Sequence, residues 1–229
     1  MTTFIKKVIG SSKEEIEKKK FNIYIGISLG NKWFTKKNIR EYIVWALKHT
    51  KNKVVILIAD KLHSINYEIR GGYNHERAVK KALREGNKFL KLLKGIISGL
   101  PDEKKEKIDI IRWEKLEKIS EHKKAVKILY REFNKNKDFK KHISRIVKQS
   151  MEKEFSEKEI EKLSYYVLNE LPEMLRGFYY KKDYYNAYIY PFYMSVADFV
   201  EKLQKKKLFP RLYDKLGIMK TIVIELKVN

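Results

Sequence analysis

Tyr166 and Glu170 are four residues apart in a segment with helical character, and Ser28 follows a short apolar segment far upstream. Residues spaced by four share one face of a helix, so the phenol and the carboxylate would point into the same space. Both groups can exchange protons, and a serine hydroxyl can act as a nucleophile. A serine directly after a strand lies where open α/β sheets carry their chemistry. The spacing therefore predicts two proton-exchanging groups on one helix face and a serine at a position typical of active sites, and the fold must join the two segments for them to act together.

The elements that would position these residues alternate between strands and helices. Apolar runs predict strands over residues 21–27, 54–59, 108–113 and 219–228. The second run is apolar throughout, as in a central parallel strand covered on both faces. Helical patterns cover residues 35–48, 68–98 and 114–170, the last with two breaks. This alternation predicts an α/β fold with a doubly wound, mostly parallel sheet flanked by helices.

Local signals set the expected boundaries. Residues 1–20 are rich in Ser, Lys and Glu and are expected to form a loosely ordered lead-in to a single domain over residues 21–229. Ser156 begins a capping box for the helix that carries Tyr166 and Glu170. Pro172 is expected to end or bend that helix, and Pro191 to open the next one.

The composition is strongly basic. Among 229 residues, 52 are Lys or Arg and 29 are Asp or Glu, a formal net charge of +23. Such an excess attracts polyanions, with nucleic acid as the first candidate and an anionic membrane surface as the second. The neutral alternative is a Lys-rich proteome. The absence of cysteine excludes disulfides, thiolate catalysis and Cys-ligated zinc. Without a signal peptide or a membrane span of ~18 apolar residues, a cytoplasmic protein is expected.

The placement of the charge within residues 68–98 favours nucleic acid. Seven cations follow spacings of three and four and fall on one side of the predicted helix: Arg77, Lys80, Lys81, Arg84, Lys88, Lys91 and Lys94. Apolar residues occupy the other side and are expected to dock on the sheet. Because like charges at this spacing repel one another, the pattern predicts contact with a phosphate backbone. The alternative is a plain solvated lysine face, whereas a membrane helix would need its apolar face free.

Taken singly, the chemical signals are weak. The segment 26–31 is neither a Walker loop nor a dinucleotide-binding glycine pattern. A serine after a strand is most often a turn or cap residue, and a Tyr–Glu pair is usually a simple hydrogen bond. The five histidines are scattered, and the cluster at residues 184–190 could be a packed aromatic corner.

Taken together, two segments resemble the two sequence signatures of the cyclodipeptide synthases. The first signature, an apolar strand that ends in Gly, an aliphatic residue and Ser, is met by residues 25–28. The second, which holds Tyr, Glu and Pro at fixed spacing, is met in full by residues 166–172. The sequence departs from the first signature at Asn22, where the family usually has His, and at Tyr24, where it has an aliphatic residue.

Two further features extend the resemblance over nearly the whole chain. Tyr190-Pro191 is similar to the marker pair of the Tyr-Pro subfamily, although Asn31 is typical of the other subfamily, so this assignment rests on Pro191. The basic helix lies where the family places its tRNA-binding helix. The resemblance thus implies tRNA contacts by Arg77, Lys80, Lys81, Arg84, Lys88 and Lys91.

The resemblance implies an enzyme that takes amino acids from two aminoacyl-tRNAs and joins them in a cyclic dipeptide (a diketopiperazine). The expected course is ping-pong, through an aminoacyl-serine and then a dipeptidyl enzyme. The implied fold is Rossmann-type, close to the catalytic domains of class I tyrosyl- and tryptophanyl-tRNA synthetases. The ATP-site signatures of those synthetases are absent, as expected if the substrate arrives already activated. No cofactor, metal or stable protein partner is implied, and a monomer is expected.

The resemblance also assigns roles to residues. Ser28 is the expected nucleophile, Tyr166 and Glu170 bind the first α-ammonium group, and Tyr190 relays a proton. Substrate-binding residues are expected to be Gly26, Asn31, Tyr24, Ile56, Ile58, Glu173 and Met174, with a second pocket drawn from residues 192–195.

Two other readings stay open. A non-catalytic RNA-binding module derived from a synthetase-like domain would need the basic helix alone. A serine hydrolase is disfavoured because neither a Gly-x-Ser-x-Gly elbow nor a partner histidine is evident.

Overall fold

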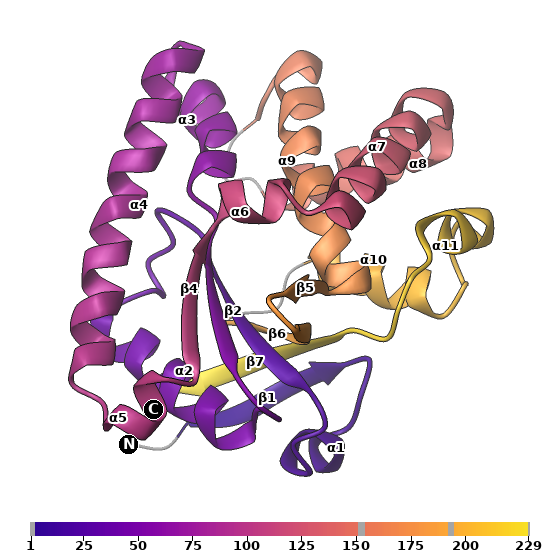
Figure 1. The fold of residues 1–229 in the computed structure, drawn as a ribbon. Helices are drawn as coiled ribbons and strands as arrows, with labels where there is room; N and C mark the ends of the chain where they lie inside the picture. The colour runs from indigo at the N-terminus through magenta and orange to yellow at the C-terminus, as the bar shows by residue number, and fades with distance from the viewer. Residues whose placement is uncertain (1–2, 151–153, 192–194, 229) are drawn as a thin grey trace.

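The core of the protein is a sheet assembled from strands far apart in the chain (Figure 1). The computed structural model describes residues 3–150, 154–191 and 195–228. The strand order is β1-β7-β6-β2-β3-β4, and β5 pairs with β6. Parallel pairs join β4, β3, β2, β6 and β7, which confirms the predicted mostly parallel sheet. The strands are β1 (Thr3–Ile9), β2 (Asn22–Ile27), β3 (Val54–Ile58), β4 (Ile108–Arg112), β5 (Phe178–Tyr180), β6 (Asp183–Tyr190) and β7 (Ile222–Val228).

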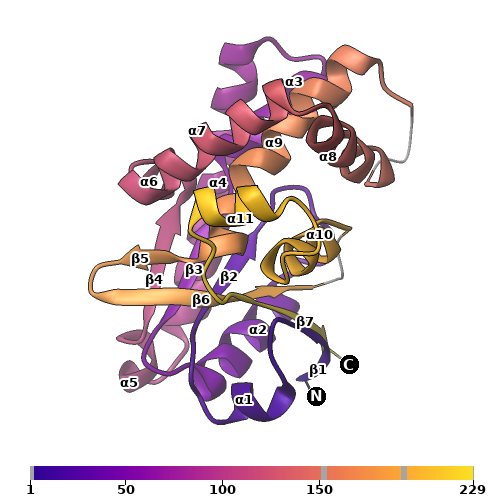
Figure 2. The same cartoon turned by 90° about the vertical axis from the view of Figure 1, so that its right-hand side faces the viewer.

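Helices cover both faces of the sheet, as expected for a doubly wound fold. In Figure 2, α1 and α2 lie below the sheet, and α9, α10 and α11 lie above it. No helix in the described ranges is both long and apolar enough to cross a membrane. The helices are α1 (Lys13–Glu17), α2 (Lys36–His49), the 3₁₀ turn η1 (Lys61–His63), α3 (Ser64–Gly71), α4 (His75–Ser98), α5 (Asp102–Lys105), α6 (Trp113–Glu117), α7 (Ser120–Lys135), α8 (Lys137–Gln149), α9 (Glu157–Arg176), α10 (Ser195–Gln204) and α11 (Pro210–Leu216).

The predicted strands over residues 21–27, 54–59 and 108–113 correspond to β2, β3 and β4. Every residue of β2 and β3 is buried. Their continuous apolar character follows from this position, because a strand at the centre of a doubly wound sheet contacts helices on both faces.

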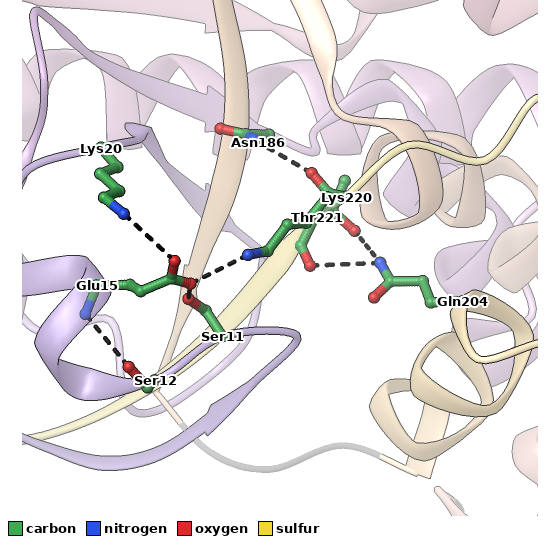
Figure 3. Close-up of polar contacts among 8 residues, drawn as sticks. All are labelled: Ser11, Ser12, Glu15, Lys20, Asn186, Gln204, Lys220 and Thr221. Carbon is green, nitrogen blue, oxygen red and sulfur yellow. Dashed lines mark hydrogen bonds and ion pairs between the residues drawn. The ribbon is translucent and has the colours of Figure 1, made fainter.

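The structure differs from the expectation of a loosely ordered lead-in over residues 1–20. β1 pairs antiparallel with β7, and Ser12 caps α1. Glu15 on α1 accepts hydrogen bonds from the Ser11 hydroxyl at 2.6 Å and from the Lys220 ammonium at 3.0 Å (Figure 3). These contacts tie the segment to the chain just before β7. Composition alone did not indicate this order because the partners that tie the segment to the rest of the fold, β7 and Lys220, are more than 200 residues away.

Two helix predictions also differ from the structure. Residues 68–98 form two helices, because Gly72 ends α3 with a φ of 65° and Asn74 caps α4 by accepting from the Arg77 N–H. Pro172 lies inside α9, which continues to Arg176. The capping box at Ser156 is confirmed. The helix predicted to open at Pro191 falls partly on residues 192–194, which lie outside the described residues.

The order of the strands places a crevice beside Ser28. From β2 the chain proceeds to β3 and β4 on one side, whereas β6 and β7 lie on the other side of β2. In such sheets the carboxyl ends of the two strands at the switch point flank the ligand site. Ser28 directly follows β2, and Tyr190 is the last residue of β6. Two segments about 160 residues apart therefore meet at one edge of the sheet.

Candidate active site

A cavity of about 610 Å³ opens at this switch point. Its wall includes Ser28 and Asn31 from the loop after β2, Tyr166 and Glu170 from α9, and Tyr190 from β6. The volume lies within the range of pockets that bind small organic ligands. The structure thus brings all four residues predicted to be catalytic into one cavity, together with Asn31.

A continuous chain of hydrogen bonds links these five side chains. The Asn31 amide donates to the Tyr190 hydroxyl at 3.3 Å. Tyr190 donates to the Ser28 hydroxyl at 3.1 Å. Ser28 is hydrogen-bonded in turn to Tyr166, and Tyr166 to the Glu170 carboxyl. Because Ser28 accepts a hydrogen bond from Tyr190, it can donate its own proton to Tyr166, and Tyr166 can donate to Glu170. Every hydrogen bond of the chain then points toward Glu170.

Glu170 ends this chain as a buried carboxyl group. Burial raises its pKa from 4.5 to about 7, and the hydrogen bond from Tyr166 offsets only part of that rise. At neutral pH the group is therefore present in both protonation states. This is the property expected of a residue that accepts and returns a proton.

The two tyrosines of the chain act as hydrogen-bonding groups rather than as anions. Burial raises the pKa of Tyr166 well above its ordinary value, and the nearby Glu170 carboxyl raises it further. Burial likewise raises the pKa of Tyr190 to about 12. Both phenols keep their protons at neutral pH and can donate to an oxygen that gains negative charge.

The predicted wall residues lie behind the cavity rather than in it. Ile56, Ile58 and Met174 are buried in the core, and Tyr24 is buried with its hydroxyl donating to the Glu173 carbonyl oxygen at 3.1 Å. None of these five residues lines the cavity next to Ser28.

Tyr188 separates that layer from the catalytic residues. Its ring stacks on Tyr24 with 4.9 Å between centroids and lies 5.6 Å from the ring of Tyr190. A Cβ atom on Gly26 would come within 2.5 Å of the Tyr188 ring, so only glycine fits there. The space above Gly26, which was expected to bind substrate, is filled by this tyrosine. The sequence did carry one indication of this arrangement. Tyr188 and Tyr190 are two residues apart, and alternate residues of a strand share a face.

Glu173 forms an unusual buried pair with His122. Each side chain is about 5% exposed, and the His122 Nδ1 lies 4.0 Å from the Glu173 Oε2, too far for a hydrogen bond. Burial, together with the Glu170 carboxyl, raises the pKa of Glu173 well above its usual range, and burial lowers the pKa of His122 to about 4. Both groups are therefore neutral, and the pair is a polar contact inside the core rather than an ion pair.

Comparison with known proteins identifies the family. The sequence model of the cyclodipeptide synthases matches residues 4–178. The chain belongs to the cyclodipeptide synthase family. The family predicted from the two signatures is thereby confirmed, whereas the Tyr-Pro subfamily stays a prediction. A comparison with curated protein sequences gave no match.

Solved cyclodipeptide synthases share the fold along most of their length. The enzyme from Staphylococcus haemolyticus is 19% identical with a TM-score of 0.75, over 97% of this chain and 99% of that one. A synthase from Candidatus Glomeribacter gigasporarum, solved bound to Phe-tRNAPhe, is 15% identical with a TM-score of 0.59, over 90% and 88% of the chains. The tyrosyl-tRNA synthetase of Archaeoglobus fulgidus is 12% identical with a TM-score of 0.60, over 96% and 60%. The expected likeness to a class I synthetase fold is confirmed.

The basic helix of this cyclodipeptide synthase is α4. It packs on α3, which lines the cavity, and the cations of its outer face are solvent-accessible. The repulsion among these cations is smaller than the sequence suggested, because carboxylates of the same helix pair with several of them. Glu85 pairs with Lys88 at 2.9 Å and with Arg84 at 3.7 Å, and Glu76 pairs with Lys80. Such exposed pairs contribute little, so phosphates could replace the carboxylates at low cost.

The cavity of the synthase also contains residues that sequence reasoning missed. His63, Asn66, Arg70 and Trp33 all line it. No spacing in the sequence connects Trp33 with the other three, because α2 and β3 separate them in the chain. The only local signal was the spacing of Asn66 and Arg70 by four residues, which places them on one face of α3.

Proposed function

We propose that this protein forms a cyclic dipeptide from the aminoacyl groups of two aminoacyl-tRNAs. The observation that carries the proposal is the hydrogen-bond chain from Asn31 through Ser28 to the buried Glu170, inside a cavity at the switch point of the sheet. Family membership and the solved complex of another family member with Phe-tRNAPhe support the substrate class.

In the first half-reaction, the Ser28 oxygen attacks the ester carbonyl carbon of the first aminoacyl-tRNA. The new serine ester forms as the bond between the carbonyl carbon and the ribose oxygen breaks, and the proton of Ser28 ends on that ribose oxygen. The hydrogen bond that Ser28 accepts from Tyr190 and its hydrogen bond with Tyr166 fix the position of the nucleophile. Because the ester is already activated, this step needs no ATP.

In the second half-reaction, Tyr166 and Glu170 hold the α-ammonium group of the acyl chain bound to Ser28. Glu170 takes one of its protons, and the free amine attacks the ester carbonyl carbon of the second aminoacyl-tRNA. The bond from that carbon to the ribose oxygen breaks, and the ribose oxygen takes the second proton that the amine loses. The products are a dipeptide esterified to Ser28 and a released tRNA. A carboxyl group with a pKa of about 7 suits this exchange, since an α-ammonium group titrates about one unit higher.

Ring closure frees Ser28, and the enzyme returns to its starting state once Glu170 has released its proton to solvent. The terminal amine of the dipeptide attacks the carbonyl carbon of the Ser28 ester, and the bond to the serine oxygen breaks. Tyr190 gives a proton to that oxygen and takes up the proton that the amine loses. The hydrogen bond that Tyr190 already donates to Ser28 supports this direction of transfer.

The first side chain is proposed to extend from Ser28 toward the layer formed by Tyr24, Ile56, Ile58, Glu173 and Met174. Tyr188 stands at the entrance to that layer, stacked on Tyr24. Assignment to the Tyr-Pro subfamily rests on Pro191, and Asn31 is proposed to contact substrate in addition to Tyr190. The tRNA body is proposed to lie along the cationic face of α4, in a protein that acts as a cytoplasmic monomer.

The direct test is incubation of the purified protein with tRNA charged with labelled amino acids, followed by mass spectrometry of small products. The proposal predicts cyclic dipeptides with the wild type and none with Ser28→Ala. If tRNA binds but no cyclic product forms over the whole set of charged tRNAs, the protein is the non-catalytic RNA-binding module. Free amino acids released in place of cyclic dipeptides would indicate a hydrolase.

A further inference from the structure

A second set of polar side chains lines the cavity and takes no part in the proposed chemistry. His63 ends η1, and Asn66 and Arg70 lie on the following helix α3. Asn66 and Arg70 are four residues apart, so they share one face of the helix, and His63 precedes Asn66 by three. We refer to these three residues as the α3 strip.

The deep end of the α3 strip is a neutral imidazole beside the loop that carries Ser28. The His63 Nε2 lies 3.9 Å from the position of a Cβ atom on Gly30. Its Nδ1 is buried without a hydrogen-bond partner. Burial, helped by the charge of Arg70, lowers the pKa of His63 to about 4, so the ring carries one N–H at neutral pH. A buried N–H without a partner is rarer than an unpaired acceptor, which favours the N–H on Nε2.

An exposed indole lines the same cavity from a different segment. Trp33 is 49% exposed, whereas Trp45 and Trp113 are 7% and 1% exposed. Two hydrogen bonds hold the backbone at this position: the backbone N–H of Trp33 donates to Asn31 Oδ1 at 3.0 Å, and its carbonyl oxygen accepts from Asn38 at 2.9 Å. An aromatic face in contact with solvent is suited to stacking on a nucleobase.

The charge in this part of the cavity is positive. Lys32 and Arg70 both line it and are exposed. Glu170 is the one carboxyl group among the described lining residues, and it belongs to the catalytic chain. A phosphate would therefore meet cations there rather than carboxylates.

The ester substrate decides which part of a tRNA can reach these groups. Its acyl carbon must contact Ser28, and this carbon is bonded directly to the ribose of the 3′-terminal adenosine. The ribose therefore lies within the cavity, and the base and the 5′-phosphate of the same nucleotide lie directly beside it. We propose that Trp33 and the α3 strip form the binding site for this terminal adenosine. Trp33 stacks on adenine, Arg70 pairs with the 5′-phosphate, and Asn66 and His63 hydrogen-bond the ribose.

This inference rests on the proposed function but can be tested without synthesis. The probe is a short single-stranded RNA ending in CCA, uncharged and labelled with fluorescein at its 5′ end, far from the terminal nucleotide. Fluorescence anisotropy gives its Kd, and the same RNA without the final adenosine is the reference. The wild type is expected to bind the RNA ending in CCA about 5- to 150-fold more tightly, the range of one base–aromatic stack.

Trp33→Ala should lower that preference at least fivefold, because the stack is lost while the contacts of the α3 strip remain, and Trp33→Phe should restore part of it because it keeps an aromatic face. Arg70→Gln should raise the Kd for the RNA ending in CCA roughly tenfold or more. The matched control is Arg211→Gln, an exposed arginine of α11 away from the cavity lining, which should leave the Kd unchanged. Thermal melting checks that each variant is folded.

Any of three results would overturn the inference. The first is a wild type that does not distinguish the two RNAs. The second is a Trp33→Ala variant that keeps the full preference for the terminal adenosine, and the third is an Arg70→Gln variant that binds as the wild type does. Those outcomes would mean that Trp33 and the α3 strip bind another group, such as the second aminoacyl side chain. If the RNA binds as expected but no cyclic dipeptide forms, the proposed function fails and the nucleotide site stands.

Discussion

Replacing Glu170 by Gln should make the protein more stable and abolish its activity. The carboxyl group is buried beside Tyr166, and burial raises its pKa from 4.5 to about 7. An amide keeps the shape of the side chain and can still accept the hydrogen bond from Tyr166, but it cannot ionise. The variant therefore escapes the cost of a buried carboxylate and also loses the group that exchanges protons.

The size and sign of the effect follow from linkage. Below pH 4.5 the carboxyl group is protonated in both the folded and the unfolded protein, so its ionisation costs nothing. Between pH 4.5 and 7 the unfolded chain releases the proton that the folded protein keeps, and the free energy of unfolding falls as the pH rises. At about 1.4 kcal/mol per pH unit, the full cost above pH 7 is about 3 kcal/mol.

The assay is urea denaturation of the wild type and Glu170→Gln at pH 5 and pH 8. The difference in unfolding free energy should shift in favour of the variant by about 2.5 kcal/mol between the two pH values. Burial raises the pKa of Glu173 and of Tyr166 well above their ordinary values, so both stay protonated in the folded state of either protein and their contributions cancel. Glu161→Gln, on a partly exposed position of the same helix, is the matched control and should show no such shift.

A shift near zero would refute the reasoning, as would a variant less stable than the wild type at pH 8. Either result would mean that Glu170 is ionised and well solvated in the folded protein. It could then not serve as a proton acceptor tuned to neutral pH.

Two other changes test the surfaces around the catalytic chain. Reversal of Lys80, Lys81 and Arg84 to Glu should weaken tRNA binding. It should also lower the slope of log K against log salt by up to about 3, roughly one for each lost phosphate contact. The control is the same reversal of the exposed Lys205, Lys206 and Lys207, which should change neither the affinity nor the slope. An unchanged salt slope would leave α4 as a solvated face. Tyr188→Leu should open the space above Gly26 and shift the cyclic dipeptides toward larger first side chains, as read by mass spectrometry of the products. An identical product spectrum would place the first side chain elsewhere.

The parts of the fold that were predictable are those with a local cause. β3 is apolar throughout, and β2 is apolar after Asn22, because helices cover both of their faces, and the capping box of α9 is encoded within four residues. β1 and β6 were missed because their order comes from distant partners. β6 is rich in Tyr, and it is held by β2 on one side and β7 on the other.

The candidate site was predictable only where two signatures marked it. Residues 25–28 and 166–172 carried enough pattern to suggest that Ser28, Tyr166 and Glu170 meet, and the structure places them in one cavity. Tyr188 could not be assigned to the space above Gly26 without the register of β2 against β6. The α3 strip and Trp33 come from separate loops and helices, so their meeting depends on the topology of the sheet rather than on any spacing.

The central claim is that Ser28 carries the aminoacyl group, and mass spectrometry of a trapped enzyme tests it most directly. Glu170→Gln should accumulate the acyl enzyme, because its bound ammonium group is not deprotonated. After reaction with charged tRNA and trypsin digestion, the peptide over residues 21–32 contains Ser28 as its only serine. The account predicts that this peptide gains the mass of one aminoacyl group and that the gain disappears in Ser28→Ala. An unmodified peptide from an enzyme whose wild type forms cyclic dipeptides would contradict it.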